Sequence, residues 1–377
     1  MNYNNQATVL GIDVGGANLK YAVVAADQDH QKADKSESER FVTLSKSTPF
    51  PMWNESHRLA NQIAHDLAEI KRDSLIACAI TMTGELADCF FDRLTGVRHI
   101  CDHVDQACNE LDLPKPKYYC VDGVFRDREN HSGYEELLAA SNWHALAKDV
   151  AETHCDDGLL LDIGSTTTDL IPIRHGKVAT SATTDFDRLA EGSLVYIGGE
   201  RTSAAMIVDH LEYRGQNIVI MREHFATIAD ARLVLKLISE SPHERNTPDG
   251  QPLTLKHSVN RLARLIGLSY QDLNLSEAKH LARQIHEAAK EKINEGLLKL
   301  TQEYGPTNRF VISGHNDDML ALPSSAELIT LRDSIDDDGA RAAPAVAIAR
   351  LLLRQHQSNG WATEKANPAL QLKEPRS

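Results

Sequence analysis

Two stretches of the sequence combine aspartate, glycine and small polar residues in a spacing that suits phosphate chemistry. The first runs from Asp13 to Lys20 and reads DVGGANLK, and the second runs from Asp162 to Asp169 and reads DIGSTTTD. Glycines let backbone N–H groups approach an anion closely, because no Cβ intervenes. The hydroxyls of the second stretch add further donors to phosphate oxygens. A plain β-turn is the alternative for either stretch alone, but the pair favours phosphate binding.

From these two stretches we predict the phosphate-binding residues. They are Gly15, Gly16, Asn18, Lys20, Gly164, Ser165, Thr166, Thr167 and Thr168. Asp13 and Asp162 precede the glycines, at the ends of two apolar runs. Carboxylates in such a position suit Mg²⁺, so we predict that these two aspartates hold magnesium. The alternative is that each aspartate caps its own turn.

The elements that position these residues form an internal repeat. Residues 7–26 combine short apolar runs, rich in β-branched residues, with a glycine break, which predicts two strands joined by a turn. Residues 158–182 repeat this pattern. A repeat at this distance predicts a duplicated α/β fold in which each half contributes one hairpin. We expect two lobes, with the site in a central cleft where the hairpins converge.

The length of 377 residues also favours two domains. We place the boundary near residue 155, with an N-terminal lobe over 1–155 and a C-terminal lobe over 156–355. Residues 200–257 show no clear periodicity and are expected to form an insertion in the second lobe. Residues 356–377 are polar and contain two prolines, so we expect a disordered tail.

The composition of the chain disfavours some classes of binding partner. The formal net charge of −14 disfavours non-specific binding to nucleic acids or anionic membranes. No apolar run is long enough to span a bilayer, and the N-terminus lacks a signal-peptide pattern. The six cysteines form no CxxC pair, which favours reduced thiols over a disulfide framework or a zinc site. We therefore expect a cytoplasmic protein without nucleic-acid or membrane partners.

The paired stretches resemble the first two phosphate motifs of the actin, sugar-kinase and heat-shock-protein superfamily. This resemblance implies an actin-like ATPase fold, of the ribonuclease H-like type, in each lobe. The third motif of that superfamily holds adenosine and reads apolar-apolar-Gly-x-Gly, and its candidate here is 311–316, VISGHN. Gly314 joins the predicted ligands, whereas His315 stands where the second glycine would be. The sequence thus leaves ATP binding open.

Several further segments share a narrower resemblance. They are 81–86, 140–143, 162–172, 187–189, 194–196, 199–202, 223–227 and 261–264. These segments resemble the hydantoinase/oxoprolinase-related family tied to tetrahydromethanopterin-linked one-carbon transfer. Its archaeal members are methanofuran-biosynthesis synthases, which join an aminomethyl-furanmethyl diphosphate to the phenol of γ-glutamyl-tyramine and release diphosphate. The resemblance implies a transferase whose small-molecule partners are this diphosphate and a tyramine- or tyrosine-type acceptor.

This chemistry suggests the remaining candidates. A phenol with a pKa of about 10 needs a base at neutral pH, and we predict Asp169 or Asp185 for that role. Glu85 follows a buried strand and is a third catalytic candidate, with a surface charge as the alternative. Further substrate contacts are predicted for Asn142, Arg188 and Arg201. Either arginine could bind diphosphate bidentately or pair with a neighbouring acid.

Two other function classes stay open. An ATP-dependent hydrolase of cyclic amides would share the narrower resemblance but would need a bound nucleotide. A non-enzymatic actin-like regulator would bind nucleotide without turning it over. ATP binding therefore separates both classes from a diphosphate-releasing synthase.

Overall fold

The computed structural model describes residues 7–25, 42–130 and 133–358. The chain folds into two units that exchange short segments. The first unit combines the residues up to Asp156 with 173–178 and with the residues from Thr330 onward. The second unit holds 157–172 and 179–329.

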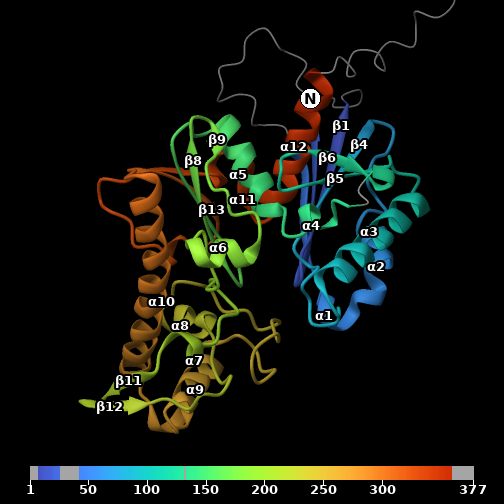
Figure 1. The fold of residues 1–377 in the computed structure, drawn as a ribbon. Coiled ribbons are helices and arrows are strands. Elements are labelled where there is room, and N and C mark those ends of the chain that lie inside the picture. The colour runs from blue at the N-terminus through green and yellow to red at the C-terminus, as the bar shows by residue number, and fades with distance from the viewer. Residues whose placement is uncertain (1–6, 26–41, 131–132, 359–377) are drawn as a thin grey trace, which may run out of the picture. The chain divides into compact units, whose positions relative to one another are not determined.

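The first unit is built on a six-stranded sheet, shown with its helices in Figure 1. Its strands follow the order β3-β2-β1-β4-β5-β6, in which β1 is antiparallel to β2 and parallel to β4. Their bounds are β1 (Thr8–Val14), β2 (Asn18–Ala25), β3 (Val42–Pro49), β4 (Leu75–Met82), β5 (Pro116–Tyr119) and β6 (Phe125–Asp127). All seven residues of β1 are buried, so helices must cover both faces of the sheet.

Side chains that alternate along β1 meet different helices. Leu10, Ile12 and Val14 share a core with residues of α2 and α3, whereas Gly11 faces α12. The helix α5 packs against α12 on that second face. The helices of this unit are α1 (Met52–Glu55), α2 (Leu59–Asp66), α3 (Arg93–Glu110), α4 (Glu135–Leu138), α5 (Asn142–Thr153), α11 (Arg332–Arg341) and α12 (Ala343–Ser358).

The second unit repeats the strand order of the first. Its sheet runs β10-β8-β7-β13-β14, with β7 and β8 joined by a tight turn and β13 parallel to β7. The bounds are β7 (Gly158–Ile163), β8 (Thr168–Arg174), β10 (Leu194–Val195), β13 (Arg309–Gly314) and β14 (Glu327–Thr330). A hairpin followed by a parallel strand thus occurs in both sheets. This confirms the duplicated α/β fold that the sequence repeat predicts.

Helices and a small hairpin complete the second unit around one hydrophobic core. They are α6 (Asp185–Glu191), α7 (Ala204–Ile207), α8 (Ile228–Leu235), α9 (Leu255–Leu265), α10 (Leu275–Tyr304), β11 (His210–Tyr213) and β12 (Gln216–Val219). Residues 200–257, for which the sequence shows no clear periodicity, contain α7, β11, β12 and α8. Side chains of α7, β11 and α8 belong to the same core as those of β7 and α10, so the segment is an integral part of this unit.

The C-terminal end divides differently from our expectation. Residues 330–358 belong to the first unit, not to the lobe predicted over 156–355, and α12 packs against β1, β2 and β4. Residues 343–353 are buried without interruption, so this helix needs apolar partners all round, which the sheet and α5 supply. The short strand β9 (Lys177–Val178) also joins the first unit, against α5.

The predicted disordered tail over 356–377 begins within α12, which continues to Ser358, and residues 359–377 lie outside the described residues. No disulfide joins the six cysteines, all of which are described. Within the described ranges, no helix combines the length and the apolar character needed to cross a bilayer.

The approach of α12 to β1 generates a stability prediction. A Cβ at Gly11 would lie 2.0 Å from the carbonyl oxygen of Ala345 and 3.1 Å from Cβ of Ala349. We expect Gly11→Ala to lower the free energy of unfolding by about 3 kcal/mol, because such overpacking forces the helix away from the sheet. Urea unfolding of the purified protein measures this loss.

A second-site variant tests the cause. Since the nearest atom is main chain, adding Ala349→Gly to Gly11→Ala should restore little of the lost stability. Full recovery in the double variant would mean that the side chain of Ala349 sets the spacing of the helix.

Candidate functional site

The first predicted turn joins β1 to β2 and keeps its carbonyl oxygens occupied. The amide of Gly15 donates to the carbonyl oxygen of Asn18 at 3.0 Å. The carbonyls of Gly16 and Ala17 accept hydrogen bonds of 3.0 and 2.9 Å from amides in the segment 50–52. A Cβ at Gly15 would lie 2.7 Å from the oxygen of Asn18, so this close turn requires glycine.

The second predicted turn joins β7 to β8 in the same way. The amide of Gly164 donates to the carbonyl oxygen of Thr167 at 2.9 Å. The carbonyls of Gly164 and Ser165 accept hydrogen bonds of 2.9 to 3.1 Å from amides of the segment 199–201. Gly198 lies against the back of the turn, where a Cβ would come within 2.5 Å of the amide nitrogen of Thr166.

Both turns therefore have the same polarity. Within the described residues, the amides of Gly16 and Ala17 in one turn, and of Ser165 and Thr166 in the other, donate to no protein acceptor. Successive unpaired N–H groups in a tight turn form a concavity that attracts anions. Each turn thus has the polarity that binding of a phosphate group requires, and phosphate binding itself stays a prediction. That both turns hold one ligand stays a prediction.

A buried carboxylate precedes the first turn. Asp13 is fully buried, and neither of its oxygens accepts a hydrogen bond within the described part of the chain. Nζ of Lys20, its cross-strand neighbour, lies 3.3 Å from Oδ2. Burial raises the pKa of Asp13, and the lysine acts in the opposite direction. A buried charge without hydrogen bonds is costly, so a bound cation would suit this carboxylate.

The residues around Asp13 could supply some, but not all, of the ligands of a Mg²⁺ ion. The described residues contain no group of three or more His, Cys, Asp or Glu side chains that could share one metal ion. Mg²⁺, however, is held in many enzymes by one or two carboxylates together with water and substrate phosphates. Asp13 meets that requirement in the first unit. Asp162 holds the equivalent position in the second unit and is only partly buried.

Gly314 lies beside Asp162 at the end of β13. It has a positive φ of 84°, and a Cβ there would come within 2.8 Å of the carbonyl oxygen of Ile163 and 3.6 Å of Oδ1 of Asp162. The glycine of the third predicted motif therefore contacts the strand that leads into the second turn. This contact explains why glycine is required at this position.

The charged candidates of the second unit meet at Arg188. This side chain is buried, and its Nη2 donates to Oδ1 of Asp169 at 2.5 Å and to the carbonyl oxygen of Ser193 at 3.1 Å. Oδ1 of Asp185 lies 3.9 Å from Nη1. The structure thus shows the acid pairing that was the alternative for Arg188. It also brings both predicted bases to the same guanidinium group.

Glu85 is not a surface charge, so that alternative is wrong. Its side chain is buried, and Oε1 accepts a hydrogen bond of 3.0 Å from the amide of Ala140. Ala140 has a left-handed φ of 47°, so this bond stabilises an unfavourable backbone conformation. Asn142 begins α5 just beyond it, and its Oδ1 accepts from the amide of Trp143. Glu85 thereby fixes the turn that presents Asn142.

Two other predicted phosphate- or substrate-binding residues, Thr168 and Arg201, differ in burial. The hydroxyl of Thr168 is buried and donates to the carbonyl oxygen of Ile197 at 2.7 Å. Its proton is therefore used within the protein and not offered to a ligand. The exposed Arg201 follows the second turn closely, because its amide donates to Ser165 at 2.9 Å. Arg201 is thus anchored by its backbone next to the free amides.

Sequence reasoning missed two residues that support the second turn. The side-chain amide of Asn316 donates to the carbonyl oxygens of Ile163 and Gly164, and Nη1 of Arg232 donates to Asn316. Two local signals exist: Asn316 ends the segment 311–316 of the third predicted motif, and the pair Gly198-Gly199 indicates a close approach of backbones. Nothing in the sequence identifies Arg232 as the residue that approaches it.

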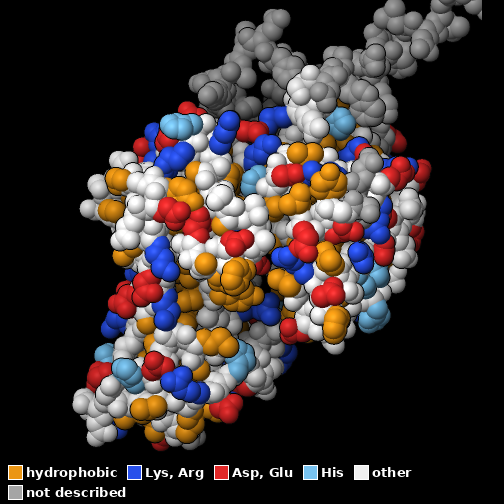
Figure 2. Space-filling view, in the orientation of Figure 1, with side chains coloured by type: hydrophobic (Ala, Val, Ile, Leu, Met, Phe, Trp, Pro, Cys, Tyr) orange, Lys and Arg blue, Asp and Glu red, His pale blue; other side chains and the backbone are white. Residues whose placement is uncertain are grey.

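An apolar surface adjoins the pair of Arg188 and Asp169. Figure 2 shows hydrophobic side chains gathered over α6. Phe186 is 81% exposed, Leu189 is 47% exposed, and Tyr196, which follows β10, is 64% exposed. Exposed apolar groups gathered next to charged residues are typical of a ligand-binding surface.

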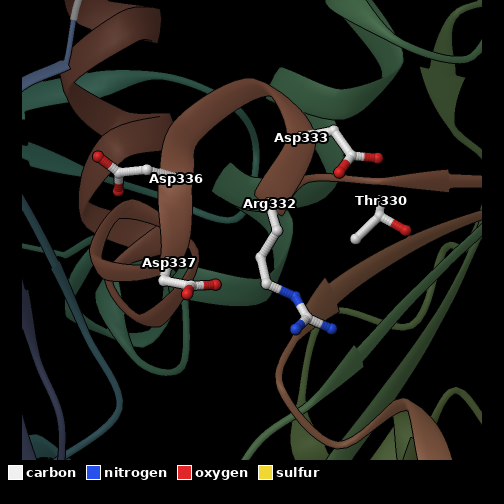
Figure 3. A pocket seen from close by; sticks show the side chains of 5 residues that line it. All are labelled: Thr330, Arg332, Asp333, Asp336 and Asp337. Carbon is white, nitrogen blue, oxygen red and sulfur yellow. The ribbon is translucent and has the colours of Figure 1, made fainter.

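The first unit also has a surface hollow beside α11. Its lining consists of Thr330, Arg332, Asp333, Asp336 and Asp337 (Figure 3). None of the predicted site residues lines it.

Comparisons with known proteins place the chain in one family. A family model described as hydantoinase/oxoprolinase matches residues 77–352. The (4-{4-[2-(gamma-L-glutamylamino)ethyl]phenoxymethyl}furan-2-yl)methanamine synthase of Methanocaldococcus jannaschii is 33% identical over 350 residues, which cover 92% of this chain and 98% of that enzyme. The enzyme of the same name from Methanococcus vannielii is 30% identical over 201 residues, covering 52% of this chain and 90% of that enzyme. A nucleotide-free structure of acetone carboxylase aligns with 91% of this chain and 70% of the carboxylase chain, at 10% identity and a TM-score of 0.47.

The burial of Asp13 predicts a stability that depends on pH. Because burial raises its pKa above the ordinary value of 3.8, the folded state binds this proton more tightly than the unfolded chain does. The ionised carboxylate therefore destabilises the fold at neutral pH. We expect Asp13→Asn to raise the free energy of unfolding at pH 7 by about 1 kcal/mol or more, measured by urea unfolding.

The difference should shrink as the pH falls through the raised pKa of Asp13 toward the ordinary value of 3.8, because the folded wild-type carboxyl gains its proton in that range. Asp122→Asn is the control of opposite sign, because a hydrogen bond from Arg126 lowers the pKa of Asp122. That variant should lose stability at pH 7. A loss in both variants would contradict the interpretation of Asp13.

Proposed function

The chain belongs to the hydantoinase/oxoprolinase family, and from this we propose that it is a transferase that joins a furanmethyl diphosphate to a phenol and releases diphosphate. The observation that carries the proposal is the similarity of nearly the whole chain to a synthase whose name describes its product. That name contains a phenoxymethyl group attached to a furan, and so an ether bond between a phenol oxygen and a furanmethyl carbon. We infer the reaction from the chemistry of this bond.

The step that we propose exchanges one C–O bond for another. The bond between the furanmethyl carbon and diphosphate breaks, and its electron pair leaves with the diphosphate. A lone pair of the phenol oxygen forms the new bond, and the phenol proton passes to a base. The furan oxygen spreads the positive charge that develops on the methyl carbon. The main task of the enzyme is therefore to stabilise the departing diphosphate.

The second turn suits this task. In our proposal, the free amides of Ser165 and Thr166, together with their hydroxyls, donate to the oxygens of the departing diphosphate. Fixed donors of this kind stabilise charge without having to reorganise during the reaction. Asp13 and Lys20 are proposed to act at the first turn. Asp13 would hold Mg²⁺, which supplies positive charge to phosphate oxygens when bound.

The surface over α6 suits the phenolic acceptor. Phe186 offers an exposed aromatic face, and Asp185 precedes it with a side chain that is 30% exposed. We propose that Asp185 takes the phenol proton, because Oδ1 of Asp169 already accepts from Arg188. Asp169 then orients the guanidinium group that holds α6 against β8.

We propose that the enzyme serves methanofuran-type cofactor biosynthesis for tetrahydromethanopterin-linked one-carbon metabolism in the cytoplasm. Its partners would be the furanmethyl diphosphate and a tyramine- or tyrosine-type acceptor. A hydrolase of cyclic amides is the second candidate, since the matching family model bears the hydantoinase/oxoprolinase description.

An assay of product formation tests the proposed reaction. We expect the purified protein with Mg²⁺, the aminomethyl-furanmethyl diphosphate and a phenolic acceptor to form ether and diphosphate in equal amounts without ATP. Asp13→Asn should reduce the rate at least about tenfold, by analogy with the loss of a metal-site residue. Mass spectrometry detects the ether, and a coupled phosphate assay detects the diphosphate.

Absence of ether with both tyramine- and tyrosine-type acceptors would refute the transferase. ATP-dependent opening of a cyclic amide would support the hydrolase instead. Tight ATP binding in calorimetry without turnover of either substrate would identify a regulator.

The exposed aromatic surface gives a prediction that separates acceptor binding from folding. We expect Phe186→Ser to raise the KM for the phenolic acceptor about 3- to 10-fold, as the loss of one aromatic contact implies. The KM for the diphosphate and the melting temperature should stay unchanged, because Phe186 is 81% exposed.

Phe91→Ser is the matched control, since Phe91 is 97% exposed and belongs to the other unit. This control should leave both KM values unchanged. Equal effects of the two variants on the acceptor KM would show that the surface over α6 does not bind the acceptor.

A further inference from the structure

We propose that Asn316 and Arg232 are positioning residues that hold the turn 164–167 in its anion-binding conformation. This inference rests on the proposed function, since it concerns the same diphosphate site. Neither residue belongs to the turn, and they lie far from it in the sequence. Asn316 follows β13, and Arg232 lies on α8.

The side chain of Asn316 reaches the backbone that leads into the turn. Its Nδ2 donates to the carbonyl oxygen of Ile163 at 2.9 Å and to that of Gly164 at 3.3 Å. Its Oδ1 accepts from Nη1 of Arg232 at 2.8 Å. The partners fix this orientation, because carbonyl oxygens only accept and a guanidinium group only donates. A reversed amide would face like groups on both sides.

Arg232 is itself held from several directions. It is 1% exposed, and its Nη1 also donates to the carbonyl oxygen of Gly199 at 2.6 Å. Nε and Nη2 donate to the two carboxylate oxygens of Asp318 at 2.9 and 2.6 Å. Nε2 of His286, on α10, lies 3.0 Å from Oδ2 of Asp318. The guanidinium group therefore cannot rotate without breaking a bidentate ion pair.

The space around this contact is filled. A Cβ at Gly199 would lie 2.4 Å from Cγ of Asn316 and 2.7 Å from Nη1 of Arg232. The segment 199–201 can approach the turn only because residue 199 has no side chain. Asn316, Arg232 and Gly199 thus pack together behind the turn, on the side of its carbonyl groups.

The consequence for binding follows from the polarity of the peptide group. The carbonyls of Ile163 and Gly164 have partners behind the turn, so the amides of Ser165 and Thr166 stay available for an anion. Without Asn316, the peptide between residues 163 and 164 loses its side-chain donor and gains freedom to rotate. A carbonyl that turns toward the site repels the phosphate oxygens that the amides would bind.

The test measures binding of inorganic diphosphate by calorimetry in the full-length chain with Mg²⁺. Asn316→Leu has a similar size and no charge, and it removes the hydrogen bonds of the side chain. Asn316→Asp keeps an acceptor for Arg232 but replaces the donor to the two carbonyls. We expect both variants to bind diphosphate at least about tenfold more weakly, as the loss of a supporting residue behind a ligand site implies.

Controls distinguish a loss of positioning from a general loss of structure and from charge repulsion. Asn260→Asp changes an equivalent amide of the same unit, whose Oδ1 accepts from the amide of Tyr270, and should bind diphosphate as the wild type does. The defect of Asn316→Leu should persist at high salt, which screens charge but does not restore geometry. In the synthase assay, the KM for the diphosphate should rise more than the KM for the acceptor.

The outcomes distinguish this inference from the proposed function. If the wild type binds diphosphate and Asn316→Leu binds it equally well, the positioning role is wrong and the synthase proposal stands. If only Asn316→Asp is weakened and high salt restores it, repulsion explains the effect and the positioning role is also wrong. If the wild type does not bind diphosphate, the anion site itself is refuted. Should Asn316→Leu fail to fold, Arg232→Lys, which keeps the charge but loses the bidentate pair, takes its place with the same expected loss.

Discussion

The hydrogen bonds to the carbonyl oxygens of the two turns are the constraint on which the candidate site depends. A tight turn can offer amides to an anion only when its carbonyls have other partners, because each peptide group carries both polarities. The segment 50–52 supplies these partners in the first unit, and the segment 199–201 supplies them in the second. The two halves of the duplication therefore reach the same polarity with unrelated sequences, as the proposed anion site requires.

Charge is distributed differently around the two turns. In the first unit, Asp13 faces Lys20 across the hairpin and is otherwise unpartnered within the described residues. In the second unit, Asp169 takes the place that Lys20 has in the repeat, and the buried Arg188 pairs with it. A buried carboxylate whose oxygens accept no hydrogen bond is costly even with one lysine 3.3 Å away, whereas an acid that accepts a hydrogen bond from a buried arginine is satisfied. The first turn is thus the one that gains more from a bound cation.

Local pattern was enough to predict the two hairpins, their repeat and the α/β class, because these depend on residues close together in the sequence. It could not assign residues 330–358 to the first unit, since an apolar helix fits either sheet equally well by periodicity. It also could not reveal that Glu85 is buried under Ala140, or that Asn316 supports Gly164. Such contacts join residues dozens to more than a hundred positions apart. Their side chains show no local sign of burial.

The second unit contains three fully buried arginines. Arg188, Arg232 and Arg261 are its largest fully buried side chains, and each is paired with an aspartate. Burying an ion pair gives little net stability compared with apolar packing, so stability alone does not explain these arginines. Two of them hold the strands and loops around the turn 164–167. Stabilisation of a leaving group works best when the donors are oriented before the bond breaks, and rigid pairs behind the turn meet that requirement.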